Sequence, residues 1–156
     1  MRIHLLAVGT RMPRWVEDGF AHYQRRLPPE LKLELGEIRL ATRGRNADTR
    51  RAREQEGEKL LARAPRHATL IALDENGQGW DSAGLSRRLS EWMASGQDLA
   101  LMVGGPDGHS PAVKQAAQQQ WSLSPLTLPH ALVRVMVAEQ IYRAWSLLSN
   151  HPYHRA

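Results

Sequence analysis

The sequence contains no cysteine, and none of its apolar runs is long enough to cross a membrane. The absence of cysteine excludes a disulfide framework, a thiolate zinc site and a cysteine nucleophile. Residues 1–15 have too short an apolar run for a secretory signal and lack a small-residue cleavage site. No pair of histidines has the spacing typical of a metal site. We therefore expect a cytoplasmic protein that binds neither a metal ion nor a membrane.

The chain has the length and composition of one folding unit. It has 156 residues, of which 42% are hydrophobic, and this is enough to bury a core without disulfides or metal. It has no internal repeat, no low-complexity tract and no segment typical of a linker between domains. Residues 1–156 are therefore predicted to form a single domain.

Positive charge is concentrated in the first half of the chain. The formal net charge is +5, and residues 1–66 carry 15 Lys and Arg against 9 Asp and Glu. Guanidinium groups bind phosphate through two parallel hydrogen bonds, so clustered arginines around a turn-like segment favour RNA contact. The alternative is a solvated surface that is merely rich in arginine. The candidate RNA-binding residues are Arg43, Arg45, Arg50 and Arg51.

Strand-like and helix-like patterns alternate along the chain. Strands are predicted at 3–8, 31–35, 68–73, 99–103 and, with interruptions, 121–128. Helices are predicted at 13–27, 48–64, from 82 onward, at 110–120 and at 132–149. Strands separated by helices predict an α/β fold with a mainly parallel sheet flanked by helices.

Local signals refine these boundaries. Asp48 is predicted to cap its helix, and Glu56 is placed with other charged residues on the solvent side of that helix. The glycines in residues 76–79 predict a turn, after which Ser82 caps the next helix. Ser110 and Pro111 form an N-cap and N1 pair.

Three predicted strand ends could converge on one pocket. They are Leu73, Gly104 in the glycine-rich loop 104–108, and the run 123–128. Ligands of open α/β sheets bind at the carboxyl ends of strands, and glycine lets the backbone approach a ligand closely. The loop lacks the dinucleotide fingerprint and the P-loop lysine. A tight turn without a ligand, and ordinary sheet core for 123–128, remain the alternatives.

The last helix and the tail carry a second group of polar residues. Glu139 and Arg143 stand four residues apart on an apolar helix, in the order that favours an ion pair. Arg134 opposes the dipole at the start of that helix, which points to a phosphate or carboxylate partner. The apolar circumference of the helix suggests a homodimer interface. Residues 150–155 carry groups that bind bases and phosphates, although a frayed terminus is the alternative.

Four segments, AVGTRMPRW, VGGPDG, LSPLTLPHALVRVMVAEQIYRAW and NHPYHR, resemble the RlmH family of SPOUT-class ribosomal RNA methyltransferases over nearly the whole chain. The resemblance implies a C-terminal deep trefoil knot, a rare exception to unknotted connectivity. It also implies a homodimer in which one subunit completes the cofactor pocket of the other. The implied contacts to S-adenosyl-L-methionine are Leu73, Gly104, Leu123, Ser124, Pro125, Leu126, Thr127 and Leu128.

The family resemblance also implies a reaction, the methylation of N3 of pseudouridine 1915 in helix 69 of 23S rRNA on assembled ribosomes. For this reaction Arg143 and Arg155 are expected to stabilise negative charge on the base, as an oxyanion site does. His154 is a candidate proton acceptor, Tyr153 a positioning group, and Glu139 the residue that orients Arg143. The alternative function is a ribosome- or RNA-binding protein without catalysis, which would not bind S-adenosylmethionine.

Overall fold

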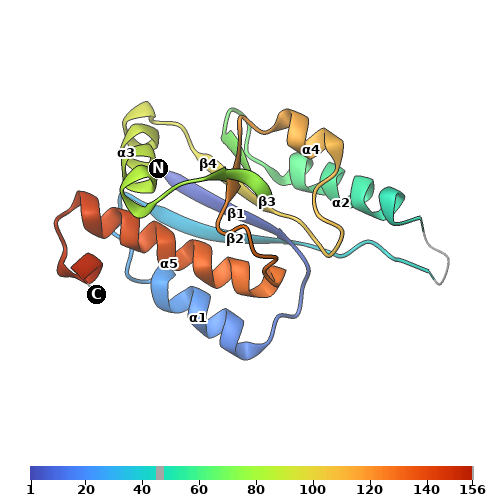
Figure 1. Ribbon diagram of the computed structural model, residues 1–156, viewed down its shortest axis with the longest axis horizontal. Helices are drawn as coiled ribbons and strands as arrows, with labels where there is room; N and C mark the ends of the chain where they lie inside the picture. The colour runs from blue at the N-terminus through green and yellow to red at the C-terminus, as the bar shows by residue number, and fades with distance from the viewer. Residues whose placement is uncertain (45–47, 156) are drawn as a thin grey trace.

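A five-stranded parallel sheet lies at the centre of the protein (Figure 1). The structure is a computed structural model that describes residues 1–44 and 48–155, the last of these by its backbone only. Its sheet order is β2-β1-β4-β3-β5, and every pairing is parallel. The strands are β1 (Arg2–Val8), β2 (Lys32–Ile38), β3 (Thr69–Gly79), β4 (Leu99–Val103) and β5 (Gln119–Ser122). The predicted α/β fold with a mainly parallel sheet is confirmed.

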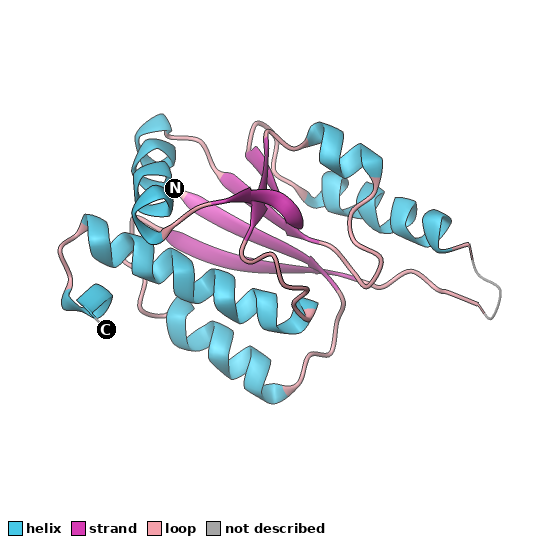
Figure 2. Cartoon of the chain, in the orientation of Figure 1, coloured by secondary structure: helices cyan, strands magenta, loops and turns pink. Residues whose placement is uncertain are grey.

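Helices cover both faces of this sheet (Figure 2). Helices α1, α3 and α5 pack on one face, and α2 and α4 pack together on the other. The bounds are α1 (Arg14–Gln24), α2 (Thr49–Arg63), α3 (Ser82–Ser95), α4 (Pro111–Ala116), α5 (His130–Leu148) and the 3₁₀ helix η1 (Pro152–Arg155). Within the described part of the chain, no helix is both long and apolar enough to span a membrane.

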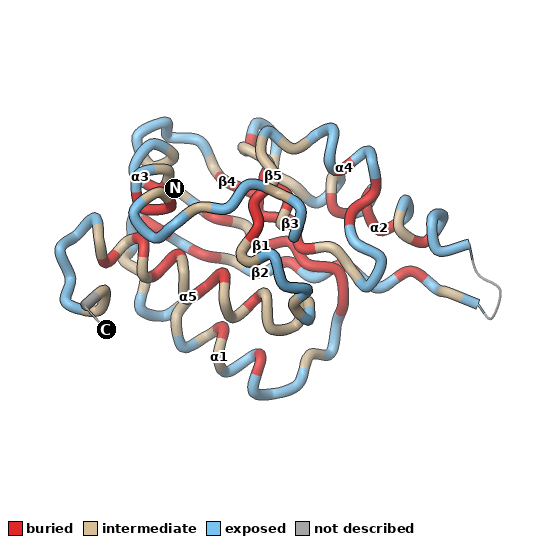
Figure 3. The backbone as a smooth tube through the Cα atoms, in the orientation of Figure 1, coloured by how far each residue is buried: buried red, intermediate tan, exposed pale blue. Residues whose placement is uncertain are grey.

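The central strands are buried on both faces, as Figure 3 shows for β1 and its neighbours. In β1, Ile3 and Leu5 face the α1, α3 and α5 layer, whereas Leu6 and Val8 face α2 and α4. Such strands are continuous apolar runs because no side of them reaches water. Each fully buried aliphatic side chain contributes about 1.5–3 kcal/mol to folding. The core thus lies on both sides of the sheet and holds its carboxyl edge in place.

The predicted turn at 76–79 is wrong, because β3 continues through this segment to Gly79. After an irregularity following Leu73, residues of the second half of β3 pair again with β5. A Cβ on Gly77 would lie 2.7 Å from the backbone oxygen of Gln120. The glycine is therefore required by the close approach of β5, and it does not mark a turn.

Three other boundaries differ from the sequence-based prediction. The N-cap of α3 is Asp81, whose carboxylate accepts a hydrogen bond from Gly84 N at 2.7 Å, and Ser82 is the first helical residue. Helix α4 ends at Ala116 because the following residues already pair with β3 as β5. Residues 123–128 therefore leave the sheet as a loop instead of continuing the strand.

Candidate functional site

The segments that follow β4 and β5, together with Leu73 in β3, meet around a cavity of about 570 Å³. This volume lies within the range of about 300–1,000 Å³ that is typical of ligand pockets. The predicted convergence of the three strand ends is thus confirmed. Of the eight candidate cofactor-binding residues, Pro125 does not line the cavity; those that do are Leu73, Gly104, Leu123, Ser124, Leu126, Thr127 and Leu128.

The glycine-rich loop 104–108 forms one wall of the cavity. Gly108 N donates a hydrogen bond to Gly105 O at 3.0 Å, and Gly108 has a φ of +75°, which favours glycine. A Cβ on Gly104 would lie 2.9 Å from the backbone carbon of Gly108. The glycines therefore let the loop fold tightly on itself, which sets the shape of this wall.

Glu75 anchors the opposite wall, the loop 123–128. Its carboxylate accepts a hydrogen bond from Thr127 Oγ1 at 2.7 Å, and its backbone oxygen accepts one from Ser122 Oγ at 3.0 Å. Leu126 N donates to Ser124 Oγ at 3.0 Å. Glu75 was not predicted as a site residue, because it lies next to the predicted turn at 76–79. Its position two residues after the predicted strand end at Leu73 could have indicated it.

Ionisable groups line the floor of the cavity. Lys114 Nζ lies 3.3 Å from Asp74 Oδ2. Burial acts to raise the pKa of Asp74, but the Asn76 backbone N–H and Lys114 outweigh it, so that the pKa lies below its usual value. Burial lowers the pKa of His109 and of His130, so both imidazoles are neutral at pH 7. Lys114 and His130 were also missed, although Lys114 lies in the helix that follows the glycine-rich loop and His130 lies two residues after the run 123–128. Across residues 1–44 and 48–155, no three His, Asp or Glu side chains are grouped to hold a metal ion.

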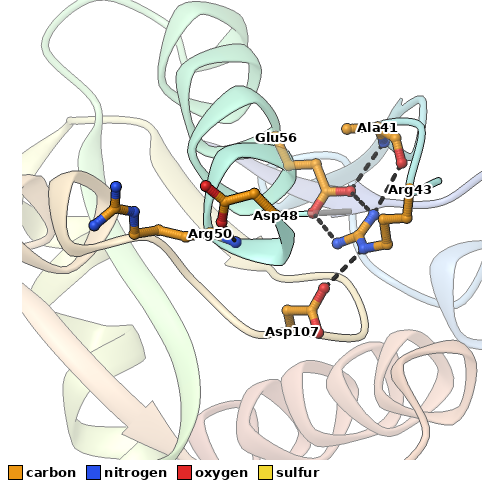
Figure 4. Close-up of polar contacts among 6 residues, drawn as sticks. All are labelled: Ala41, Arg43, Asp48, Arg50, Glu56 and Asp107. Carbon is orange, nitrogen blue, oxygen red and sulfur yellow. Dashed lines mark hydrogen bonds and ion pairs between the residues drawn. The ribbon is translucent and has the colours of Figure 1, made fainter. Parts of the chain in front are cut away.

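Behind the glycine-rich loop, Arg43 and Glu56 form a buried ion pair (Figure 4). Arg43 donates to both carboxylate oxygens of Glu56, at 2.8 and 3.0 Å, and its Nε donates to Asp107 at 2.7 Å. Glu56 also accepts from Ala41 N at 2.9 Å. The prediction that Glu56 faces solvent is wrong, since only 2% of its surface is exposed. The loop after β2 lies beside α2, and its residues Ala41 and Arg43 are the partners of this carboxylate.

The four candidate RNA-binding arginines differ in their surroundings. The donors of Arg43 are engaged by Glu56, Asp107 and Ala41 O, so this residue serves the structure of the protein itself. Arg45 lies outside the described residues. Arg50 and Arg51 are exposed in the first turn of α2, whose predicted cap, Asp48, accepts from Arg50 N at 3.0 Å. Of the described candidates, these two present charge to solvent.

A second polar cluster lies along α5 and the tail. Glu139 Oε1 accepts hydrogen bonds from Arg143 Nε and from Tyr153 OH, each at 2.9 Å. The guanidinium of Arg143 lies 5.1 Å from the centre of the Tyr153 ring. The hydrogen bond that Arg143 donates to Glu139 raises the pKa of Arg143, and burial raises the pKa of Tyr153. Both groups therefore keep their protons at neutral pH.

The tail is ordered against α5 instead of fraying. Tyr153 packs on Tyr142 with ring centres 4.6 Å apart, and η1 ends the described chain beside the last turns of α5 (Figure 1). His154 is partly buried, and its Nδ1 has no hydrogen-bond partner among the described residues. The backbone of Arg155 belongs to η1.

Within one chain this polar cluster is remote from the cavity. Val133 lines the cavity, whereas none of Glu139, Arg143, Tyr153 and His154 does. About 15 Å of helix separates Val133 from Arg143 at the rise of an α-helix. Glu139, Arg143 and Tyr153 thus contact one another, but they lie away from the cavity that most of the candidate cofactor-binding residues line.

Arg134 is the most deeply buried charged residue of α5, with 1% of its surface exposed. Its Nη1 donates to Glu37 Oε2 at 2.7 Å, and its Nη2 donates to Gly9 O at 2.8 Å. Of the two partners expected for Arg134, a phosphate or a carboxylate, the structure shows a carboxylate. The pair connects the ends of β1 and β2 to the start of α5, where His130 and Val133 line the cavity.

Comparison with known proteins identifies the family. Residues 1–154 match the family described as "Predicted SPOUT methyltransferase". A protein of Thioalkalivibrio sulfidiphilus (strain HL-EbGR7), named ribosomal RNA large subunit methyltransferase H, is 57% identical over 155 residues, and the match covers 99% of each chain. The resemblance seen in the sequence is thereby confirmed. This chain belongs to the SPOUT methyltransferase family.

Proposed function

We propose that this protein is a methyltransferase that uses S-adenosyl-L-methionine to methylate N3 of pseudouridine 1915 in helix 69 of 23S rRNA on assembled ribosomes. The single observation that carries the proposal is the cavity of about 570 Å³ formed by the predicted strand ends in a chain of this family. The similar protein named ribosomal RNA large subunit methyltransferase H supports the choice of large-subunit RNA as the substrate. Such a substrate agrees with the expected cytoplasmic location.

The residues of the cavity fit this cofactor. Leu73, Leu126 and Leu128 offer apolar surface for the adenine ring, and the backbone of loop 123–128 offers donors and acceptors for its edge. Two buried nitrogens at the wall, Arg53 Nε and His130 Nδ1, have no hydrogen-bond partner among the described residues. When bound, the cofactor supplies a methyl group already activated by its sulfonium, so the protein must align the acceptor and control one proton.

The polar cluster of α5 is suited to that second task. The N3–H of a pseudouridine is weakly acidic, and its loss leaves negative charge on the flanking carbonyl oxygens. Arg143, held by Glu139 and stacked on Tyr153, presents a fixed positive charge to those oxygens. We assign Arg155 the same role. His154 is the candidate proton acceptor because an unperturbed imidazole titrates near neutral pH.

Because Arg143 and the cavity are remote within one chain, the proposed active site needs two copies of the protein. The cavity of one subunit would be completed by Arg143, Tyr153, His154 and Arg155 of the partner. A homodimer with isologous contacts places each tail near the other cavity through one symmetry operation. Arg50, Arg51 and Arg45 are the proposed RNA contacts, as phosphate ligands beside this composite site.

Two further features of the family complete the proposal. We propose that residues 1–156 are a single domain, a proposal supported by cores on both faces of one continuous sheet. We also propose that the C-terminal part, which includes the loops 104–108 and 123–128, is tied in a deep trefoil knot. In such a knot, the segment that contains one of these two loops passes through the segment that contains the other. This would hold both loops against the same cavity.

The test combines binding with transfer. The purified protein is titrated calorimetrically with S-adenosylmethionine, and it is then incubated with ribosomes from a strain that lacks the activity. We expect binding, and transfer of one methyl group to N3 of one pseudouridine, detected by mass spectrometry of nucleosides. Ribosome binding by a folded dimer without cofactor binding would refute the proposal and favour a non-catalytic ribosome-binding protein.

A further inference from the structure

The acidic side chains that line the cavity are all engaged by other groups of the protein. Asp74 pairs with Lys114 at 3.3 Å, and Asp107 pairs with Arg43 at 2.7 Å. Glu75 accepts the hydroxyl hydrogen of Thr127 at 2.7 Å. The carboxylates of the cavity are thus held by these partners, and none of them forms an ion pair with any other basic side chain that the structure describes at the cavity wall.

One basic side chain of the cavity wall is left without such a partner. Arg53, on α2, lines the cavity and forms no ion pair with any residue that the structure describes. Its Nε is buried and has no hydrogen-bond partner in the same part of the chain. Lys114 is paired, and burial lowers the pKa of His109 and His130, so neither imidazole is a cation at pH 7. Among the described residues of the cavity, Arg53 is therefore the positive charge without a partner.

An arginine in this state is expected to have a ligand. A buried donor without a partner destabilises the protein, and the cost is larger when the donor is charged. The backbone that carries Arg53 is held firmly, because Glu56 on the next turn of α2 is bound to Arg43, and a Cβ on Gly57 would collide with Ser110 at the start of α4. The backbone position from which the Arg53 side chain extends is thus fixed beside the glycine-rich loop.

We infer that Arg53 binds the amino-acid carboxylate of S-adenosylmethionine. This inference rests on the proposed function. The cofactor carries one carboxylate besides its cationic sulfonium and amino groups, and a guanidinium is the side chain best matched to a carboxylate. Lys114, the other cation in the described part of the cavity wall, is already paired with Asp74, so Arg53 is the group of opposite charge that the carboxylate can bind. Arg53 is thus a determinant of cofactor specificity.

The test compares two ligands that differ in this carboxylate alone. S-Adenosylmethionine and decarboxylated S-adenosylmethionine are titrated calorimetrically into the wild type, Arg53→Gln, Arg53→Lys and Lys59→Gln. The last variant removes a positive charge from the exposed side of the same helix and serves as the matched control. Circular dichroism and the elution volume verify that each variant is folded and assembled like the wild type.

We expect wild type and Lys59→Gln to prefer S-adenosylmethionine over its decarboxylated form. Arg53→Gln should weaken binding of S-adenosylmethionine about tenfold, as loss of a charge-assisted hydrogen bond does, and leave binding of the decarboxylated form unchanged. Arg53→Lys should keep part of the preference, because it restores the charge without the planar fork.

Two results would overturn the inference. Equal loss of affinity for both ligands would make Arg53 a residue that shapes the cavity, and unchanged affinity for both would remove it from the cofactor site. If the folded wild type bound neither ligand, the proposed function itself would fail, so the two failures are distinguishable.

Discussion

A single buried carboxylate joins three parts of the chain. Glu56, on α2, holds Ala41 and Arg43 after β2, and Arg43 holds Asp107 beside the cavity. At 2% exposure a carboxylate without its partner would be a buried, uncompensated charge. The Arg43–Glu56 pair therefore ties the integrity of the cavity wall to the stability of the fold.

Arg43→Ala should lower the free energy of unfolding by about 3–5 kcal/mol, because it leaves the Glu56 charge buried and unpaired. The double variant Arg43→Ala, Glu56→Gln should recover part of this loss, since the charge is then gone. Urea denaturation measures both. Arg51→Ala, an exposed change on the same helix, is the control and should stay within about 0.5 kcal/mol of the wild type. A similar value for Arg43→Ala would show that the pair is dispensable for stability.

Arg143 is the residue whose substitution separates catalysis from cofactor binding. Arg143→Ala should reduce methyl transfer by about 100-fold or more, the usual cost of losing a charge that stabilises a developing anion. The affinity for S-adenosylmethionine should change little, because the role proposed for Arg143 is toward the carbonyl oxygens of the RNA base and not toward the cofactor. Single-turnover transfer and calorimetry give the two numbers. Equal losses of both would favour a purely structural Glu139–Arg143 pair.

His109 should make stability depend on pH. Burial lowers the pKa of its imidazole in the folded protein, whereas the unfolded chain binds a proton at about pH 6.5. Below that pH the unfolded state binds more protons, so the free energy of unfolding should fall as pH decreases toward the lowered folded pKa. Urea midpoints at pH 7.5 and 5.5 test this. In His109→Gln, the free energy of unfolding should decrease less between pH 7.5 and 5.5. An unchanged decrease would show that groups other than His109 cause it.

At the level of elements, helix starts show which local signals prevail. Helices α2 and α4 begin at the predicted caps Asp48 and Ser110, whereas α3 is capped by Asp81 and not by Ser82. An acidic residue and a serine in succession both suit an N-cap, and the backbone decides which of them lies outside the helix.

Asp81→Ala should therefore destabilise the protein by about 1 kcal/mol, the typical value of an N-cap. Ser82→Ala is the matched control, and it should be neutral because the Ser82 side chain caps nothing in the structure described here. Thermal unfolding of the two variants under identical conditions gives the comparison. If Ser82→Ala were the more destabilising change, the cap would be at Ser82 after all.

For the whole molecule, the distance between cavity and polar cluster makes a prediction about assembly. Leu126 is 69% exposed at the cavity, so Leu126→Glu should disrupt cofactor binding without unfolding the chain. Co-expressed with Arg143→Ala, it would form heterodimers in which one composite site is intact. Random pairing should restore about a quarter of the wild-type transfer, although each variant alone is inactive. If no methyl transfer were restored, the cavity and the Arg143 that act together would belong to the same subunit.

The features that depend on neighbouring residues could be predicted from the sequence. Apolar periodicity identified β1 to β4 and the helices that separate the strands, and Asp48 and Ser110 marked helix starts correctly. The predicted fifth strand overlaps β5 only at Trp121 and Ser122. The strand ends at Leu73, Gly104 and 123–128 identified the cavity, because the carboxyl ends of parallel strands share one edge of the sheet. Its longer motifs also identified the family, which the comparisons confirmed.

Which distant segments of the chain meet depends on its tertiary structure. Charge and periodicity place Glu56 in solvent, but the loop after β2 folds over it and supplies Arg43. The glycines of 76–79 suit a turn, but β5 passes Gly77 so closely that the strand continues. The distance from the cavity to Arg143 likewise depends on how α5 packs across the sheet. These outcomes follow from non-local packing, which can override local preference and which no short window of sequence contains.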